Sequence, residues 1–495
     1  AAVSSPRPAR RAFTPRAVLT PTPPPPPSKS NSSSSSTLLS DTTIPDSLPA
    51  DFSSPLAAEP LDTSSNPWTD ERWRGVKWTV YRGVAYDLTK FIDMHPAGAW
   101  LVRLAIGRDA TALFESYHLR PEVAAARLRR LPVLEGFPVN AVPRSPRPND
   151  SDLYNTLRDR VRAEVFQGRE AEGAHRSGSF GAAAAVLGFA ATALSLYTLS
   201  PSLATGAVLG LAGAWIGLTV QHCGNHGAMS TSPLVNQLMG FGDDLIGGSS
   251  LAWQYHHQVS HHVHCNDDAF DEDVFSSFPL LRFDVRQPRS WYHRYQHVYM
   301  WLLFPLMQLA FQAGDWQAIV QGRTAGATLH GATAGQRALA ALGKVAHYSL
   351  LMVVPFYTHG ASAALWGAAG FTFVQGIVLA ATFAVSHNVP EAKPALVQAA
   401  EARIGSSSSS SSSSTSPLLS ADATLTTPID ERDWAVQQVT TSADYGGAIS
   451  NFMTGGLSLQ AVRERFFFNF SFFLSSFSPP FLALFFAVLA STERA

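Results

Sequence analysis

The hydrophobic positions of the chain gather in four long stretches. They run from Phe180 to Leu199, from Leu203 to Val220, from Ala341 to Tyr357 and from Ala361 to Val385. Stretches of this length suit a hydrocarbon core about 30 Å thick, so each is predicted to be a transmembrane helix. Four spans form two hairpins, which places the polar residues that follow the second and fourth spans on one side of the membrane. A shorter apolar block at residues 299–311 is predicted to lie in the membrane interface or the protein core.

A different pattern precedes the apolar stretches. In residues 66–140, short hydrophobic runs alternate with turn signals, and Trp78, Val80 and Tyr86 are spaced like the core of a small mixed domain. Residues 141–179 are polar and basic, which predicts a linker or a surface helix. The predicted fold is therefore a small α+β domain followed by an all-α transmembrane domain of about four spans at residues 180–460.

Two segments have compositions that cannot build a packed core. Residues 1–65 begin with an Arg- and Ser-rich stretch without acidic residues, followed by a proline run and a serine run. This composition is typical of a disordered organelle transit peptide, and an ordinary disordered tail is the alternative. Residues 404–428 contain the serine run Ser406–Ser414 and are predicted to be a flexible insertion.

Charge and cysteine content narrow the class of protein. The net charge is -1, so nothing favours a nucleic acid as partner. The charged fraction is 15%, which fits a membrane protein better than an average soluble one. Cys223 and Cys265 are the two cysteines, too few for a disulfide framework, and the chain is interpreted as intracellular or organellar. The sixteen histidines are more informative because they cluster.

Two histidines in the first domain are candidate haem ligands. His95 lies in the string His95-Pro96-Ala97-Gly98, and His118 follows it at the end of Phe114–His118. Haem iron accepts two axial imidazoles, one on each side of the ring, and closing both positions favours electron transfer over oxygen binding. Unrelated surface histidines are the alternative for such a pair taken alone.

Further histidines form clusters beside the predicted spans. In the first cluster, His222 and His226 are four residues apart, so on a helix they share one face. In the second cluster, His257 and His261 share a face, and His262 lies about 100° round the helix, able to reach a neighbouring metal. His387 follows the fourth span. Imidazoles with open coordination positions suit iron and oxygen chemistry, whereas structural zinc would normally recruit thiolates.

These motifs resemble two known families. The segment around His95 and His118 resembles cytochrome b5, whose signature is His-Pro-Gly-Gly, with Ala97 in place of the first glycine. The order His-x3-His, then Trp-x3-His-x3-His-His, resembles the membrane fatty acyl desaturases. It looks most like the front-end group with a fused cytochrome b5 domain, which inserts a double bond between an existing one and the carboxyl end.

The resemblance implies a set of di-iron ligands. They are His222, His226, His257, His261 and His262, with His387 as a further ligand and His297 as a weaker candidate. His256 and His264 stand where the family commonly has other residues, so they are not assigned as ligands. Trp253 and Asn388 are expected to support the ligands rather than bind metal.

The resemblance also implies the activity. Oxygen-dependent desaturation of polyunsaturated fatty acyl chains is expected, with haem b passing electrons to two non-haem irons and O2 as co-substrate. The expected partners are a fatty acyl lipid, the membrane and an electron donor of the cytochrome b5 reductase or ferredoxin type. The transit-like beginning indicates a chloroplast membrane, with the endoplasmic reticulum as the alternative. Regiospecificity, and acyl-lipid against acyl-CoA substrate, are not fixed by the residues.

One family motif is broken. The third histidine box of the family is Gln-x-x-His-His, and here Gln460 is followed by Arg463 and Glu464 at the two histidine positions. Residues 466–480 are almost entirely Phe, Ser, Leu and Pro, whose codons begin with two pyrimidines. The tail at 461–495 is therefore interpreted as a translated intron, with a fifth membrane helix as the alternative.

Two other functions stay open at this point. A sphingoid-base desaturase, or a related lipid hydroxylase, is the nearest rival enzyme, although hydroxylases of that kind have different histidine spacing. A catalytically inactive, membrane-tethered haem electron carrier is the rival from another class, because two expected ligands are missing from the chain as written.

Overall fold

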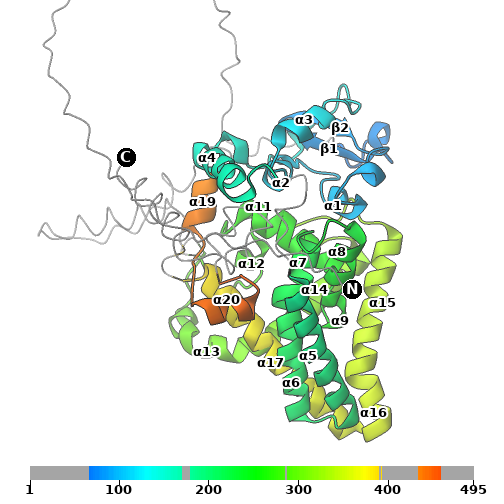
Figure 1. Cartoon of the computed structure of the whole chain (residues 1–495), viewed down its shortest axis with the longest axis vertical. Helices are drawn as coiled ribbons and strands as arrows, with labels where there is room; N and C mark the ends of the chain where they lie inside the picture. The colour runs from blue at the N-terminus through cyan, green and yellow to red at the C-terminus, as the bar shows by residue number, and fades with distance from the viewer. Residues whose placement is uncertain (1–65, 170–178, 285–286, 390–391, 393–432, 459–495) are drawn as a thin grey trace, which may run out of the picture. The chain divides into compact units, whose positions relative to one another are not determined.

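The computed structural model describes residues 66–169, 179–284, 287–389, 392 and 433–458 (Figure 1). The predicted transit-like segment, the serine-rich insertion and the tail at 461–495 lie outside these residues. Within them, a small α+β domain precedes a helical domain with four candidate membrane helices, as the pattern predicts.

A β-hairpin forms the centre of the first domain. Strand β1 (Trp78–Tyr81) pairs antiparallel with β2 (Val84–Asp87), joined by Arg82 and Gly83, which both have positive φ. Two such residues give the turn that matches the twist of a hairpin. Trp78, Val80 and Ala85 of the hairpin pack against Phe137 and Val142. The helices of this domain are α1 (Ala99–Arg103), α2 (Thr111–Tyr117) and α3 (Pro121–Leu128).

The segment predicted as a linker or surface helix is a helix with a buried side. Helix α4 (Asp152–Arg160) begins at Ser151, whose side chain accepts a hydrogen bond from the Tyr154 amide, and continues into the π-helical turn Val161–Phe166. The Tyr154 ring packs edge-on against Trp434, with centroids 5.6 Å apart, and its hydroxyl donates to the Glu115 carbonyl at 3.1 Å. This segment therefore joins the first domain to a helix almost 300 residues away in sequence.

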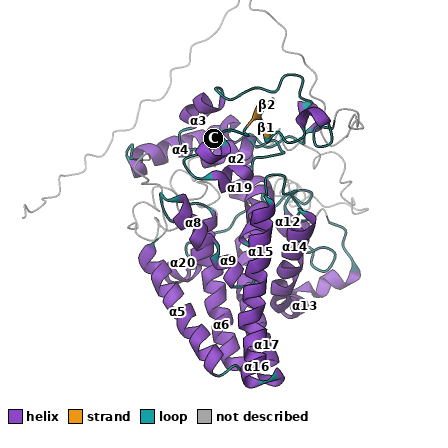
Figure 2. Ribbon diagram, turned by 90° about the vertical axis from the view of Figure 1, so that its right-hand side faces the viewer, coloured by secondary structure: helices purple, strands orange, loops and turns teal. Residues whose placement is uncertain are grey.

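The four predicted spans are confirmed as helices long and apolar enough to cross a membrane: Phe180–Leu199, Leu203–Asn225, Ala334–His359 and Ala361–His387. They comprise α5 (Phe180–Leu199), α6 (Leu203–Ile216) with α7 (His222–Asn225), α15 (Ala334–Tyr348) with α16 (Val354–His359), and α17 (Ala361–His387). Helices α5, α6, α15 and α17 run side by side (Figures 1 and 2). The predicted interfacial block at 299–311 falls on α13 (Gln296–Leu303), whose Leu302 is exposed, and on the start of α14 (Met307–Gln321).

Close backbone contact holds α6 against α17. A Cβ atom on Gly206 would overlap the carbonyl oxygen of Gly367, and one on Gly370 would overlap the carbonyl oxygen of Leu203. Small residues at such crossings let two helices approach closely in a membrane, where lipid is as apolar as the side chains. The third span adapts differently: Pro355 cannot donate to the Leu351 carbonyl, which instead accepts the Tyr197 hydroxyl at 2.6 Å.

A turn between α9 (Gly242–Leu245) and α10 (Ser250–Trp253) inserts its carbonyl groups between the long helices. Lys344 donates to the Gly247 carbonyl at 2.6 Å and to Asp315 at 2.6 Å, and Gln308 and Gln375 both donate to the Ile246 carbonyl. Side chains from three helices thus satisfy backbone carbonyls that no helical or sheet hydrogen-bonding pattern could satisfy. This explains the charge inside the third apolar stretch: Lys344 is fully buried and fixes the turn that leads into the second histidine cluster.

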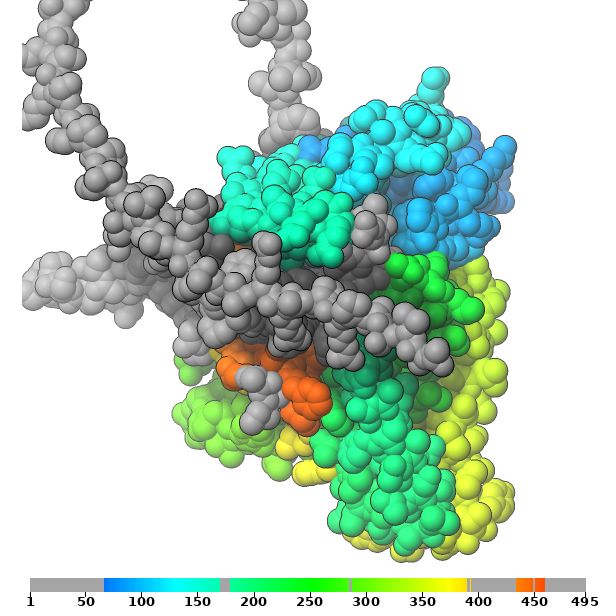
Figure 3. All heavy atoms as spheres, in the orientation of Figure 1, coloured from blue at the N-terminus to red at the C-terminus, as the bar shows by residue number. Residues whose placement is uncertain are grey.

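The shorter helices α8 (Pro233–Gly240), α11 (His262–His264), α12 (Glu272–Phe275), α19 (Trp434–Thr440) and α20 (Ala448–Thr454) surround the end of the bundle that carries the histidines. Residues of the last described segment, orange in Figure 3, pack against the second span. Phe452 contacts Trp215, and Leu457 joins a buried cluster with Ala214 and Leu218.

Candidate haem cleft and metal centre

His95 and His118 face each other across the first domain. Their ring centroids lie 6.0 Å apart and the ring planes are nearly perpendicular, at 85°. Two metal–nitrogen bonds of about 2 Å, plus about 1 Å from each nitrogen to its ring centre, would place the centroids roughly 6 Å apart. The spacing therefore fits one iron held between the two imidazoles.

Local contacts prepare both rings for that role. Nδ1 of His118 hydrogen-bonds the Phe114 carbonyl at 2.7 Å, which leaves Nε2 for a ligand. Burial, and to a smaller extent the neighbouring His118, lower the pKa of His95 to about 4. Burial also lowers the pKa of His118, although its bond to Phe114 acts in the opposite direction. Both rings are thus neutral near pH 7 and have a lone pair to donate.

The departure from the cytochrome b5 signature has a structural explanation. The turn after His95 places the left-handed backbone conformation on Gly98, with φ of 95°, and not on Ala97. Only the second glycine of the signature is needed for this turn, so the methyl group of Ala97 is tolerated.

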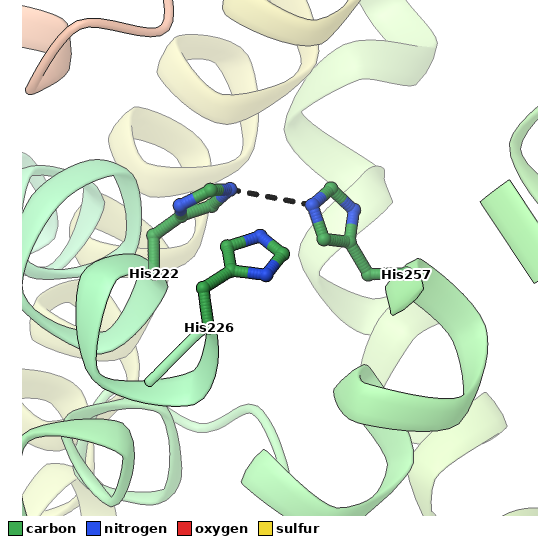
Figure 4. Close-up of side chains that lie close together, drawn as sticks. All are labelled: His222, His226 and His257. Atoms are coloured by element: carbon green, nitrogen blue, oxygen red, sulfur yellow. Dashed lines mark hydrogen bonds between the residues drawn. The ribbon is translucent and has the colours of Figure 1, made fainter. Parts of the chain in front are cut away.

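The histidines of the two predicted boxes meet at the end of the second span. Nε2 of His257 lies 3.3 Å from Nε2 of His222 and 3.0 Å from Nε2 of His262. His226 completes the group, with ring centroids 5.3 Å from His257 and 5.1 Å from His262 (Figure 4 shows His222, His226 and His257 pointing toward one another). Trp253 covers the group, with its ring 4.2 Å from that of His257.

The winding of the second box differs from the expectation. The box was expected to be α-helical, with His262 about 100° from the face of His257 and His261. Residues Gln254–His261 instead form a π-helix, in which residues five apart stack. His262 is therefore closer to His257 than His261 is, with ring centroids 4.3 Å and 5.3 Å away. A second π-helical turn, Gly217–Gln221, precedes His222.

His261 faces the other side of the cluster, toward the end of the fourth span. Its ring lies 4.7 Å from that of His387, and the ligand atoms of His261, His387 and Cys265 all lie within 4.8 Å of one another. The same holds for His257, His261 and Asp273, and for His222, His226 and His257. The cluster therefore offers more than one set of three ligand atoms. Cys265, which the sequence analysis did not include among the candidate ligands, is buried against His387.

A buried carboxylate orients His261. Asp271 is fully buried, and its Oδ2 lies 3.0 Å from Nδ1 of His261. Burial raises the pKa of Asp271, and the neighbouring His261 acts in the opposite direction. A carboxylate on the outer nitrogen of a histidine fixes the tautomer that points Nε2 at a metal.

The histidines left out of the ligand set lie apart from the cluster's inner face. Nε2 of His256 pairs with Asp273 at 2.5 Å. Burial alone would lower the pKa of His256, but Asp273 and Glu272 outweigh it and raise the pKa to about 9. His264 stacks on Phe270, and His297, the weaker candidate, is exposed on α13.

Sequence reasoning missed the amides that hold the two boxes together. The side-chain carbonyl of Asn225 accepts hydrogen bonds from Ser250 at 2.7 Å and Gln254 at 3.1 Å, and its amide donates to Gln221 at 2.8 Å. Nε2 of Gln258 donates to the Asn225 backbone carbonyl at 2.7 Å. A signal was present: Gln221 and Asn225, like Gln254 and Gln258, are polar residues four apart beside the histidines.

Helix α19 completes the support of the second box. Gln438 donates to the His262 carbonyl, Trp434 to the Val263 carbonyl and Gln437 to the Cys265 carbonyl, each at 3.2 Å. The last carbonyls of a helix have no partner within it, so these bonds cap the helix that carries the histidines. Helix α19 thus supports the site through the backbone of the second box.

Electrostatics keeps the cluster ready for a cation. Burial, and then the neighbouring His262, His222, His226 and His261, lower the pKa of His257 far below its usual value. Crowded imidazoles cannot all be protonated in a dry site, so they present lone pairs to its centre. Neutral nitrogen donors with an oriented outer shell suit a redox-active metal such as iron.

Comparison with known proteins agrees with both sites. Residues 72–142 match the cytochrome b5-like haem/steroid binding domain, and residues 198–462 match the fatty acid desaturase family. The chain is 60% identical over 409 residues to the chloroplastic acyl-lipid (7-3)-desaturase of Chlamydomonas reinhardtii. The match covers 83% of this chain and 75% of that protein.

The chain belongs to the fatty acid desaturase family. It is also 28% identical to Delta(5) fatty acid desaturase A of Dictyostelium discoideum, over 79% of this chain and 80% of that one. An acyl-lipid (7-3)-desaturase of Diacronema lutheri is 34% identical over 45% of this chain and 48% of that one. No solved structure matches the chain. The expected fold, the enzyme class and the fused haem-type domain are thereby confirmed for this desaturase.

The haem cleft gives a first prediction. His95→Ala should abolish the low-spin, six-coordinate haem spectrum of the desaturase, because the remaining His118 can fill only one axial position. His330→Ala is the control, since His330 stacks on Trp68 outside the cleft. Absorption spectra of the two purified variants make the comparison. A normal six-coordinate spectrum in His95→Ala would refute the assignment of this ligand.

The carboxylate behind His261 gives a second prediction. Asp271→Asn should weaken non-haem iron binding by roughly 10- to 100-fold, because the neutral amide orients and polarises His261 less well. Asp267→Asn is the matched control: Asp267 is buried in the same loop but accepts hydrogen bonds from the amides of Ala269 and Phe270. Iron titration of both variants tests it, and equal affinities would show that Asp271 has no role in the site.

Proposed function

We propose that this desaturase performs oxygen-dependent front-end desaturation of polyunsaturated acyl lipids, with haem b between His95 and His118 and two irons at the histidine cluster. The observation that carries the proposal is the convergence of His222, His226 and His257, whose ligand nitrogens lie within 4.8 Å of one another. We place the haem-binding domain at residues 66–140 and the desaturase domain at 180–460.

The proposed iron ligands divide between the two sides of the cluster. His222, His226, His257 and His262 line one side, and His261 with His387 line the other. Iron bound there supplies the oxidising chemistry that removes two hydrogens from neighbouring methylenes while O2 is reduced to water. The protein's own residues hold the ligands, exclude water and keep the imidazoles neutral until metal binds.

The substrate and location are inferred from the relatives and the chain's spans. The algal relative at 60% identity is named as an acyl-lipid (7-3)-desaturase and as chloroplastic, which favours the same substrate class and organelle here. The four candidate membrane helices fit a lipid substrate that stays in the bilayer. The haem between His95 and His118 would receive electrons from a reductase or a ferredoxin-type donor, one at a time.

The broken third box bears directly on the metal centre. The last described residue, Ser458, is buried, and Leu457 packs against Leu218, one helical turn before His222. Arg463 and Glu464 follow within a few residues, each spanning at most about 3.5 Å. We therefore propose that two ligands of the family belong at these positions. An arginine stays protonated and cannot ligate iron, so the chain as written has an incomplete site.

This proposal gives a third prediction, and tests the function. The chain as written should form little desaturated product, whereas Arg463→His with Glu464→His and a family-like tail after Leu459 should restore desaturation. Fatty-acid profiles of yeast expressing each chain and fed polyunsaturated acids make the comparison. The restored chain carrying His257→Ala is the inactive control.

Two outcomes would contradict the proposal. Equal, substantial desaturation by the written and restored chains would show that the third box is dispensable and that the ligand set is wrong. New double bonds in sphingoid bases, with none in fatty acids, would replace the proposed substrate class.

A further inference from the structure

The haem-binding domain is packed against the desaturase domain through a shared hydrophobic core. Buried residues from the first domain and from the segments around the second histidine box form one continuous cluster. Its members include Leu104, Ala110, Leu113, Leu251, Tyr255 and Val259. A shared core of this kind holds two domains in one orientation, in contrast to a carrier that swings on a tether.

Further close contacts at the interface fix the same orientation. A Cβ atom on Gly331 would overlap the carbonyl oxygen of Arg103, and Tyr255 donates to that carbonyl at 3.3 Å. Trp68 of the haem domain stacks on His330, with ring centroids 5.9 Å apart. Gly331 therefore has no room for a side chain while the domains are docked.

One hydrogen bond in this interface lies between the two metal sites. The Tyr117 hydroxyl donates to Oε1 of Gln258 at 2.7 Å. Tyr117 directly precedes the haem ligand His118, and Gln258 directly follows the cluster residue His257. Gln258 is fully buried, and its Nε2 donates to the backbone carbonyl of Asn225, the residue before His226, at 2.7 Å.

We propose that Tyr117 and Gln258 form the electronic bridge between the docked haem and the histidine cluster, with Tyr117 as a positioning residue. The inference rests on the proposed function, because it needs haem at His118 and iron at the cluster. From His118 the route follows one peptide unit, the Tyr117 side chain, one hydrogen bond and the Gln258 side chain. It then reaches His257 through one peptide unit, or His226 through a second hydrogen bond.

Other contacts of the interface are less suited to this role. Arg103, Arg108 and Trp68 also contact the desaturase domain. None of the three is adjacent in sequence to His95 or His118, and Gly331, Thr328 and His330 are far in sequence from the clustered histidines. Tyr255, which donates to the Arg103 carbonyl, is two residues from His257, but that bond is longer, at 3.3 Å, and Arg103 is eight residues from His95. Because coupling through bonds and hydrogen bonds exceeds coupling across gaps, the Tyr117–Gln258 contact is the favoured route.

The transfer balances as two one-electron steps per double bond formed. In each step, ferrous haem iron is oxidised to ferric while one ferric ion of the cluster is reduced to ferrous. An external flavin or iron–sulfur donor then reduces the haem again. Two electrons from the haem, two protons from solvent and two hydrogen atoms from the acyl chain together reduce one O2 to two waters.

The test compares Tyr117→Phe with Tyr81→Phe in the full chain with the restored third box, loaded with haem and ferric iron. Tyr81 is the matched control, because its hydroxyl contacts Glu115 within the haem domain. The haem is reduced by a light flash without oxygen, and its reoxidation is followed by absorbance. We expect reoxidation to slow several-fold in Tyr117→Phe and to be unchanged in Tyr81→Phe, with the haem spectrum and potential unaltered in both.

A second pair of variants tests the docking itself. Gly331→Leu should push the domains apart and slow haem reoxidation, whereas Gly335→Leu should not, because a Cβ at Gly335 has open space apart from the Thr333 hydroxyl. Both variants should keep the haem spectrum of the original chain.

Each outcome decides between distinct conclusions. Equal reoxidation rates in Tyr117→Phe and the restored chain without that change would overturn the bridge and leave the proposed function intact. A slower rate with an altered haem potential would make Tyr117 a structural residue and also overturn the bridge. A haem that is never reoxidised in the restored chain, or a restored chain that binds no iron besides haem, would overturn the proposed function and the bridge together.

Discussion

Asn225 fastens the two histidine helices to each other. Its side chain accepts from Ser250 and Gln254 and donates to Gln221, while its backbone carbonyl accepts from Gln258. All of these bonds are buried, where a polar group left without a partner costs about 1–3 kcal/mol. Because His226 follows Asn225 directly and His257 precedes Gln258, this one residue sets the distance between the first and second boxes.

The other features of the desaturase follow from that junction. Burial and the surrounding imidazoles keep His257 neutral, so its lone pair is available to a cation. The buried Lys344 and Gln375 fix the turn before the second box, α19 caps the helix after it, and Asp271 orients His261. The membrane helices thus serve as a rigid support for a site that lies at their ends.

The sequence predicted the membrane helices and the identity of the clustered histidines, for different reasons. Hydropathy specifies a span because every backbone group must be satisfied within the helix, and the family spacing picks out His222 to His387. The π-helical winding at Gln254–His261 could not be predicted, since i and i+4 spacing fits an α-helix equally well. Contacts such as Tyr154 with Trp434, or Tyr117 with Gln258, depend on how distant segments pack, which no local pattern encodes.

The most direct test of the proposed metal centre is the ratio of non-haem iron to haem in the purified chain with the restored third box and in its His257→Ala variant. His257 is chosen because its ring contacts those of His222, His226, His261 and His262. We predict that the restored chain binds iron in excess of its haem, and that the variant loses this excess while keeping one haem and its spectrum. An unchanged ratio in the variant, or a restored chain whose iron is all accounted for by haem, would contradict this.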